Sequence, residues 1–404
     1  MTVARQLIER HRLTFAASAC CLCFACSSNS PSSPPASSGG GSGNAPGTGG
    51  TGTAPGGSQN GGSGGSVAAA AGTSSGAGTS SGGSASVGGS AGTSASGGSA
   101  DVSGGAPGVA GSGGSAGAAA GPVVPVQVTG KSLYRFNFGD TILEIDAMTG
   151  ARVSKYSLAG ADMMMTAATD ATTWGSVFWT APRTGTWMPE WPPPAAIDNG
   201  AYTASIAGAH LMLTGSADTA LGVSMAKDYS ADASSGWVTI NYTVNSSKAQ
   251  KAAPWEVSRV PRGGIAFFPL GSSVSKGPLT ITQSGGMVWF DDGPKTATSS
   301  DGSKLVADGK DGWEAYAFGG NLFLKRFTDQ PTSAQAPNGE GEICLYPGAT
   351  WVEFEVQGPY TSIPAAGSLP WKVQWRLVKI PSTVTVAVGS ASLVTFAQQQ
   401  IAIP

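Results

Sequence analysis

The amino-acid composition changes abruptly near residue 121, and this break most limits what the chain can fold into. Residues 27–121 consist almost entirely of Gly, Ser, Ala, Thr and Pro, with Asp101 as the single charged residue and no aromatic side chain. Such a segment cannot bury enough apolar surface to offset the entropy lost on ordering. All 11 Trp follow the break, so residues 122–404 are predicted to form the one folded domain.

The N-terminal 26 residues have the pattern of a signal peptide that ends at a lipidated cysteine. A basic stretch at residues 5–12 precedes an apolar run at residues 13–25. This run is shorter than the roughly 20 apolar residues of a membrane-spanning helix. Its end resembles a bacterial lipoprotein processing site, with Ala25 before Cys26 and a polar stretch after it. Cys26 is the predicted lipidation site, Cys20 is the competing site, and an ordinary signal peptide is the alternative.

The residues after the cysteine indicate where the chain is held. Ser27 follows Cys26, and by resemblance to Gram-negative lipoproteins this favours the outer membrane. We therefore predict an exported protein, lipid-anchored to that membrane on its periplasmic or cell-surface side. Residues 27–121 have the composition of a flexible linker, and about 95 such residues reach on the order of 55 Å. The linker is predicted to be a spacer between the anchor and the domain.

Charge and motif content exclude several classes of function. The chain has 22 Lys and Arg against 24 Asp and Glu without any block of like charge, so no nucleic-acid partner is predicted. No phosphate-binding glycine loop precedes a helix, and there is no serine elbow or zinc-type His cluster. We predict no cofactor and no metal. Asp291 and Asp292 are predicted to lie in a turn, and a calcium site is the alternative. Cys344 is the only cysteine of the domain, so an internal disulfide is impossible and a buried thiol is expected.

The domain has the sequence pattern of half-buried strands. Residues 238–245, 351–357 and 372–377 each alternate apolar with polar side chains. Turn sequences rich in Gly, Asp and Asn interrupt such runs near residues 137, 146, 284, 291 and 318. No convincing amphipathic helix of any length is found. We predict an all-β fold, a large antiparallel β-sandwich.

Two segments rich in Trp and Pro, residues 174–182 and 186–198, are predicted to be rigid loops between strands, because proline cannot donate to a β-ladder. An aromatic ring can stack on the C–H face of a sugar, while nearby carboxylates and amides bind its hydroxyls. These loops supply candidate sugar-binding residues, namely Trp179, Trp187, Trp191 and Asp198. Core packing is the alternative for the tryptophans.

Several short segments of the domain stand out by their order and spacing: GSVFWTAP, WPPPAAID, KDY, APWEVSRVPRGG, AFFP, DGWEAYAF, LFLKRF, VEFEVQGPY and PWKVQWRL. Together they resemble a bacterial domain family of uncharacterised function within the galactose mutarotase-like superfamily. The likeness covers residues 130–381. It implies an antiparallel β-supersandwich whose concave face holds a carbohydrate site, as in aldose 1-epimerases and in domains of several sugar-cleaving enzymes.

The resemblance also implies a catalytic base. Aldose epimerases use a general-base Glu, in a stretch of the form Glu-x-Gln followed shortly by Pro, together with a general-acid His. Glu355, Gln357 and Pro359 match that stretch, so Glu355 is the candidate base and Gln357 a candidate binding residue. Strand alternation independently puts Glu353, Glu355 and Gln357 on one face. A solvated outer face is the alternative.

The general acid of the epimerases has no counterpart here. The domain contains one histidine, His210, in a segment without an epimerase-like motif. The segment APWEVSR offers Glu256 and Arg259 beside Trp255, which is a further candidate sugar-binding residue. Glu256 and Glu355 are a candidate carboxylate pair for acid–base chemistry on glycosides. Arg259 would hold an acidic sugar or orient a carboxylate, and a buried Glu256–Arg259 ion pair is the alternative.

Three functions remain open on these grounds. The first is a carbohydrate-binding domain without catalysis. The second is an enzyme acting on sugars, either an epimerase-like isomerase or a glycoside- or uronide-cleaving enzyme that uses Glu355 and Glu256. The third is an envelope scaffold. The missing histidine favours the first.

Overall fold

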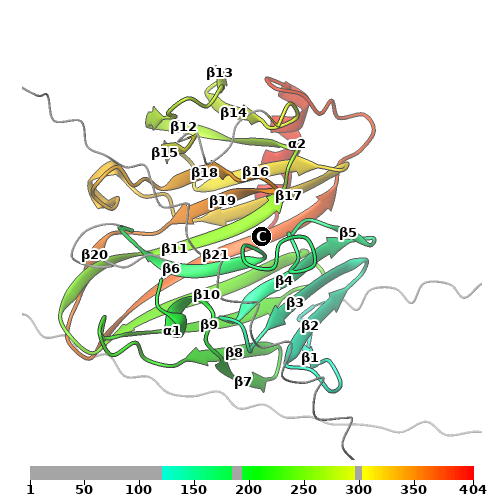
Figure 1. Cartoon of the computed structure of the whole chain (residues 1–404). Coiled ribbons are helices and arrows are strands. Elements are labelled where there is room, and N and C mark those ends of the chain that lie inside the picture. The colour runs from blue at the N-terminus through cyan, green and yellow to red at the C-terminus, as the bar shows by residue number, and fades with distance from the viewer. Residues whose placement is uncertain (1–120, 184–192, 296–302) are drawn as a thin grey trace, which may run out of the picture. The chain divides into compact units, whose positions relative to one another are not determined.

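Antiparallel strands make up most of the domain, as Figure 1 shows. The computed structural model describes residues 121–183, 193–295 and 303–404. Every strand pair in this part of the chain is antiparallel, and the strands form two sheets that share one long strand, β12 (Ile265–Ser275). The all-β antiparallel fold predicted from the sequence is confirmed.

The first sheet carries the candidate site. Its strands, in spatial order, are β1 (Val126–Gln127), β2 (Leu133–Phe138), β3 (Thr141–Asp146), β4 (Arg152–Leu158), β6 (Ser176–Ala181), β11 (Gln250–Pro261), β19 (Trp351–Gln357), β18 (Ile343–Pro347), β15 (Leu305–Gly309) and the second half of β12. Two short strands extend it, β5 (Ala161–Asp162) beside β4 and β20 (Thr361–Ile363) beside the start of β11.

The second sheet covers one face of the first. Its strands, in spatial order, are β7 (Tyr202–Ala207), β8 (His210–Gly215), β9 (Val223–Ala231), β10 (Trp237–Ser246), β21 (Gly367–Lys379), β17 (Asn321–Phe327), β16 (Trp313–Phe318), the first half of β12, β14 (Met287–Asp291) and β13 (Thr282–Ser284). The described helices are α1 (Ala195–Asp198), α2 (Ala391–Ile401) and the 3₁₀ turn η2 (Thr332–Ala334).

The alternating segments form the strands expected of them. In β10 the apolar positions at 238, 240, 242 and 244 are all buried, and the polar positions between them are partly exposed. The predicted turns are present as well: Gly139 has φ of 56° between β2 and β3, and Gly319 has φ of 58° between β16 and β17. Glycine adopts this left-handed backbone conformation without a Cβ penalty, so these residues favour tight turns.

The core lies between the two sheets and is rich in aromatic rings. Phe178 of β6 stacks on Tyr242 of β10, with ring centroids 4.1 Å apart. Phe323 of β17 contacts Phe354 of β19 at 5.6 Å and Trp375 of β21 at 5.2 Å. These rings bury large apolar areas and join both sheets into one core.

The segment at residues 174–182 was expected to be a loop, and this expectation is wrong. Residues 176–181 form strand β6, with every side chain buried. The sequence of a strand that is buried on both faces is a continuous apolar run. It therefore lacks the alternation of apolar and polar residues that is typical of a half-buried strand. Trp179 is accordingly a buried strand residue, 3% exposed.

The expectation that the domain has no helix of any length is also wrong, because α2 spans eleven residues near the C-terminus. Its N-cap is Ser390, whose hydroxyl accepts a hydrogen bond from the backbone of Leu393. Leu393 and Ala397 pack into a second apolar cluster on the outer face of the second sheet, with Trp237 and Trp313 among its members. Packing therefore stabilises a helix whose own periodicity is weak. None of the helices in the described part of the chain is long and apolar enough to cross a membrane.

Candidate functional site

Three adjacent strands, β6, β11 and β19, present buried polar and aromatic side chains on the side of the first sheet that faces away from the core. The register pairs Trp255 with both Trp179 and Gln357, and it pairs Arg259 with Glu353. Side chains at alternate positions share a face, so Glu355 lies between Glu353 and Gln357. We call this surface the β6–β11–β19 face. The predicted placement of the three β19 residues on one face is confirmed.

Glu355 is fully buried on this face and is held by one hydrogen bond. Its Oε2 accepts from Nε1 of Trp255 at 2.8 Å, whereas its Oε1 has no hydrogen-bond partner among the described residues. The Trp255 ring packs edge-on against Trp179, with centroids 5.2 Å apart. The indole therefore fixes the orientation of the carboxylate and leaves one oxygen available as an acceptor. A buried acceptor without a partner is costly unless a ligand or water supplies the donor.

Gln357 presents a second acceptor of the same kind. Its Nε2 donates to Oε2 of Glu340 at 2.8 Å, and its Oε1 is buried and meets no donor in the described part of the chain. The other carboxylate oxygen of Glu340 accepts from the backbone N–H of Arg183, at 3.1 Å. Sequence reasoning missed Glu340, which lies outside any strand between Asn338 and Ile343. No period-two pattern marks such a position.

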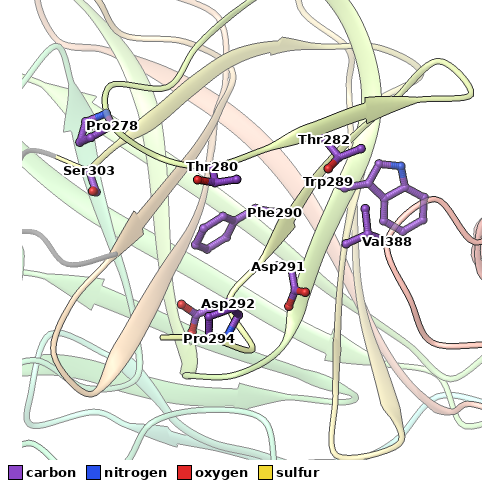
Figure 2. Close-up of a pocket in the computed structure, with 10 residues that line it drawn as sticks. All are labelled: Pro278, Thr280, Thr282, Trp289, Phe290, Asp291, Asp292, Pro294, Ser303 and Val388. Atoms are coloured by element: carbon purple, nitrogen blue, oxygen red, sulfur yellow. The ribbon is translucent and has the colours of Figure 1, made fainter. Parts of the chain in front are cut away.

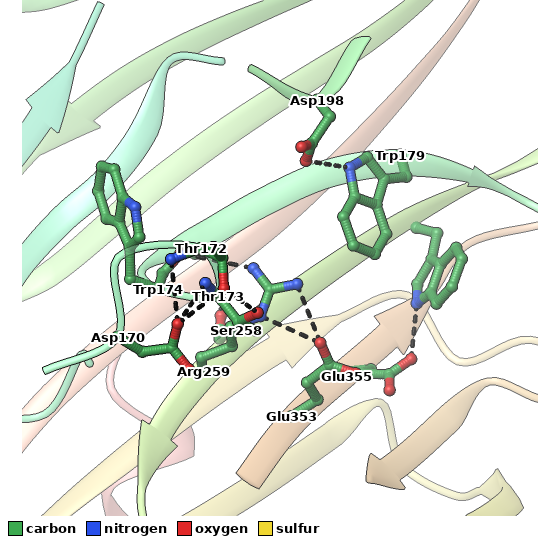
Figure 3. A network of polar contacts seen from close by, with 12 residues as sticks. Asp170, Thr172, Thr173, Trp174, Trp179, Asp198, Ser258, Arg259, Glu353 and Glu355 are labelled. Carbon is green, nitrogen blue, oxygen red and sulfur yellow. Dashed lines mark hydrogen bonds and ion pairs between the residues drawn. The ribbon is translucent and has the colours of Figure 1, made fainter. Parts of the chain in front are cut away.

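Arg259 is tied to Glu353 rather than to Glu256. Its Nε and Nη2 donate to Oε1 of Glu353 at 3.0 and 2.9 Å, and its guanidinium lies 5.4 Å from the Trp179 ring centroid. Figure 3 shows Arg259 reaching from β11 to Glu353 in this way. Burial raises the pKa of Glu353 to about 7, with Arg259 opposing the rise and Glu355 adding to it. Of the two predicted roles of Arg259, the geometry fits the orientation of a carboxylate.

Asp198 closes the other end of the face. Its Oδ1 accepts from Nε1 of Trp179 at 3.0 Å, and its Oδ2 accepts from Nη2 of Arg152 at 3.0 Å. Asp198 ends α1, and Gly150 packs so closely below it that a Cβ there would lie 1.9 Å from the Asp198 carbonyl oxygen. The predicted residues Asp198, Trp179 and Trp255 are thus brought together, and Arg152 joins them.

Lys304 brings a cation to the same face from the segment before β15. Its Nζ lies 5.8 Å from the Trp255 ring centroid and 5.7 Å from that of Tyr346. Burial lowers the pKa of Lys304, but Cys344, Glu355 and Glu340 around it outweigh this effect and the pKa is raised overall. The thiol of Cys344 is unpaired and buried, as predicted, and burial raises its pKa.

Glu256 does not form a pair with Glu355, and this part of the predicted site is wrong. Glu256 pairs in register with Val356, so it points to the opposite face of the sheet, into the core. There its carboxylate accepts from the Tyr242 hydroxyl at 2.7 Å and from Trp375 Nε1 at 3.1 Å, and it lies 3.0 Å from Lys325 Nζ. Glu256 is therefore part of a buried ionic network. The alternative Glu256–Arg259 pair is also absent, because residues three apart on a strand face opposite ways.

Other predicted residues lie elsewhere. Trp187, Trp191 and Cys26 are outside the described residues. His210 lies on β8 with its Nδ1 2.9 Å from Asp228, in the second sheet. Asp292 begins a turn, as predicted, whereas Asp291 is the last residue of β14 and not part of the predicted turn. The Asp292 carboxylate binds Arg262 through two bonds of 2.7 Å. Among the described residues, no group of His, Cys, Asp and Glu side chains is arranged to hold a metal ion.

A cavity of about 420 Å³ lies apart from the face, beside β13 and β14. Figure 2 shows Thr280, Phe290 and Asp292 among the residues that line it. No residue of the β6–β11–β19 face contributes to this cavity. The Asp292 carboxylate in this cavity is already bound to Arg262.

Comparison with known proteins gives structural neighbours only. No protein-family model and no curated protein matches the chain. Similar solved structures include a galactose mutarotase-like protein from Lactobacillus casei, with 12% identity, a TM-score of 0.45 and coverage of 61% of this chain and 100% of that one. Galactose 1-epimerase from Lactobacillus acidophilus has 12% identity, a TM-score of 0.39 and coverage of 64% and 98%. A TPR-domain containing protein from Parabacteroides distasonis has 11% identity, a TM-score of 0.42 and coverage of 63% and 50%. At this similarity, none of these proteins assigns an activity to this chain.

Proposed function

We propose that the β6–β11–β19 face binds a carbohydrate. One observation carries the proposal: the Oε1 atoms of Glu355 and Gln357 are both buried on the same face, and neither has a hydrogen-bond partner within residues 121–183, 193–295 and 303–404. A sugar presents several hydroxyl donors in a small volume, and its C–H faces pack on indole rings such as Trp255 and Trp179. A hydroxyl donor at each acceptor would remove the cost of leaving it unpaired.

The direct test is a glycan array probed with the full chain, followed by calorimetry with D-galactose, D-glucose, N-acetyl-D-glucosamine and D-galacturonate. We expect at least one of these sugars to bind, and Glu355→Gln to weaken that binding about tenfold, because a charged acceptor is replaced by a neutral one. Glu144→Gln is the matched control, since Glu144 is a half-buried carboxylate that pairs with Arg135 on β3, outside the β6–β11–β19 face. Absence of binding to every sugar on the array would refute the proposal.

An enzyme acting on sugars is the second candidate, and the position of Glu353 favours it. Glu353 and Glu355 share one face, and the pKa of Glu353 is raised by burial to about 7, where it can donate or accept a proton at neutral pH. Glu353 thus replaces Glu256 as the carboxyl that accompanies Glu355. Turnover of a bound sugar that is lost in Glu353→Gln, with binding retained, would establish this function over binding alone.

We further propose that the chain is a cell-envelope lipoprotein, anchored at Cys26 to the outer membrane through the linker at residues 27–121. The support is the basic and apolar leader and the processing-like sequence that ends at Cys26. Metabolic labelling with an alkyne fatty acid should mark the wild-type chain, and Cys26→Ser should lose the label. Retention of the label in Cys26→Ser and its loss in Cys20→Ser would move the anchor to Cys20.

A further inference from the structure

The orientation of the Gln357 amide is determined by Glu340, which lies outside the three strands of the face. A carboxylate can only accept hydrogen bonds, so Glu340 Oε2 accepts the Gln357 NH2 group at 2.8 Å. The amide oxygen is thereby turned away from Glu340, and it is buried with no hydrogen-bond donor from the residues that the structure describes. The other oxygen of Glu340 is held by the backbone N–H of Arg183. This second contact joins the end of β6 to the end of β19 and restrains the carboxylate.

We propose that Glu340 is a positioning residue that holds the Gln357 amide with its oxygen toward the candidate site, so that this position selects a ligand group that donates a hydrogen bond. An amide is nearly symmetric in shape, and either end can face the site at little steric cost. With Glu340 in place, only the oxygen can do so. The position therefore distinguishes a hydroxyl from a group of similar size that cannot donate.

This selectivity rests on the proposed carbohydrate function, but the positioning role can be measured without any ligand. In an NMR spectrum of the full chain, the Gln357 side-chain NH2 signal is assigned by its absence in Gln357→Ala. We expect this signal to be shifted by its bond to a carboxylate in the wild type and to move in Glu340→Gln. An unchanged Gln357 signal in Glu340→Gln would overturn the proposal. Glu144→Gln, which makes the same change at an ion-paired carboxylate on β3, should leave the signal unaltered.

The selectivity is measured with D-galactose, D-glucose and their monodeoxyfluoro analogues, in which fluorine replaces a hydroxyl and cannot donate. For the wild type, we expect fluorine at one ring position to weaken binding about tenfold, the effect of one hydrogen bond to an otherwise unpaired acceptor. In Glu340→Gln the Gln357 amide can turn over. Binding of the parent sugar should weaken, and the fluorine penalty at that position should shrink by at least about threefold.

The double variant Glu340→Gln/Gln357→Glu provides the decisive rescue. It exchanges donor and acceptor between the two side chains, so an acceptor oxygen again faces the site. We expect it to restore the fluorine penalty at the same ring position. A purely structural role of Glu340 predicts a different result. Glu340→Gln would then weaken the binding of all analogues equally, and the double variant would not restore the fluorine penalty. If neither sugar binds the wild type, the carbohydrate function fails for these sugars, while the NMR signal still decides the positioning role.

Discussion

The buried ionic network around Lys325 provides the sharpest test of the fold. Lys325 is fully buried between the sheets, with its Nζ 3.0 Å from Glu256 and 3.4 Å from Glu314. It also donates to the Phe354 carbonyl at 2.6 Å. Lys325→Met keeps most of the side-chain volume but removes the cation, which leaves Glu256 buried without a countercharge. Breaking a buried ion pair from one side costs about 3–5 kcal/mol, which lowers the melting temperature by roughly 10 °C in a domain of this size.

The network also predicts how the stability losses of Lys325→Met and Glu256→Gln combine. Glu256→Gln should cost less than Lys325→Met, because Lys325 still has Glu314 as a partner. The double variant Lys325→Met/Glu256→Gln removes both charges and should be less destabilised than the sum of the single variants. Urea unfolding of the full chain at pH 7, followed by tryptophan fluorescence, measures all three. Lys155→Met is the control, since Lys155 pairs with Asp162 at the surface with side chains 31% and 36% exposed.

Two results would refute this reasoning. One is a cost for Lys325→Met no larger than that of Lys155→Met, for which we expect less than about 1 kcal/mol. The other is that the losses in the free energy of unfolding of Lys325→Met and Glu256→Gln sum to the loss of the double variant. Either result would mean that Lys325 does not hold Glu256 in the core. A role of Glu256 outside the core would then again be possible.

Three further predictions follow from individual contacts. The folded-state pKa of Glu342 is raised by burial from 4.5 to about 8, so the wild type loses up to about 5 kcal/mol as the pH rises through that window. Glu342→Gln should therefore gain stability over the wild type between pH 4.5 and pH 8, as pH-dependent urea unfolding will show. Arg326 donates to the carbonyl oxygens of Ile401 and Ile403 at 2.9 and 3.1 Å, so Arg326→Gln should speed amide exchange in α2, with a cost of about 1–2 kcal/mol. Gly150→Ala would force a Cβ against Asp198 at a φ of 64°, and should destabilise the domain by about 2 kcal/mol or more and alter the near-ultraviolet signal of the nearby tryptophans.

Part of the candidate site could be predicted because it lies along one strand. Glu353, Glu355 and Gln357 alternate with apolar residues, and the period of two by itself puts them on a common face. The relation of Glu256 to this set could not be predicted in the same way. It depends on the register between β11 and β19, and a shift of one residue would turn every β11 side chain to the other face.

The residues that contact the site from outside its strands could not be predicted from the sequence for a related reason. Glu340 and Lys304 lie in segments without a period-two pattern. Glu340 reaches the face by its bond to Gln357 of β19, and Lys304 by its contact with the Trp255 ring, and both contacts join segments that are distant in sequence. The segment that became β6 has no alternation, since the core covers one side and the candidate site lies on the other. The helix α2 depends on the apolar cluster of the second sheet, which forms only when strands distant in sequence pair.

The alternating runs after residue 121 were sufficient to predict the all-β fold and many of its turns, because these features depend on neighbours along the chain. The tertiary structure alone decided that Trp179, Trp255 and Arg259 stand beside Glu355, and that Glu256 does not. Those relations are set by pairing between strands up to about 100 residues apart, as in the bond from Trp255 to Glu355. The residues near each strand in the sequence do not determine the register between the strands. The packing of the two sheets determines it.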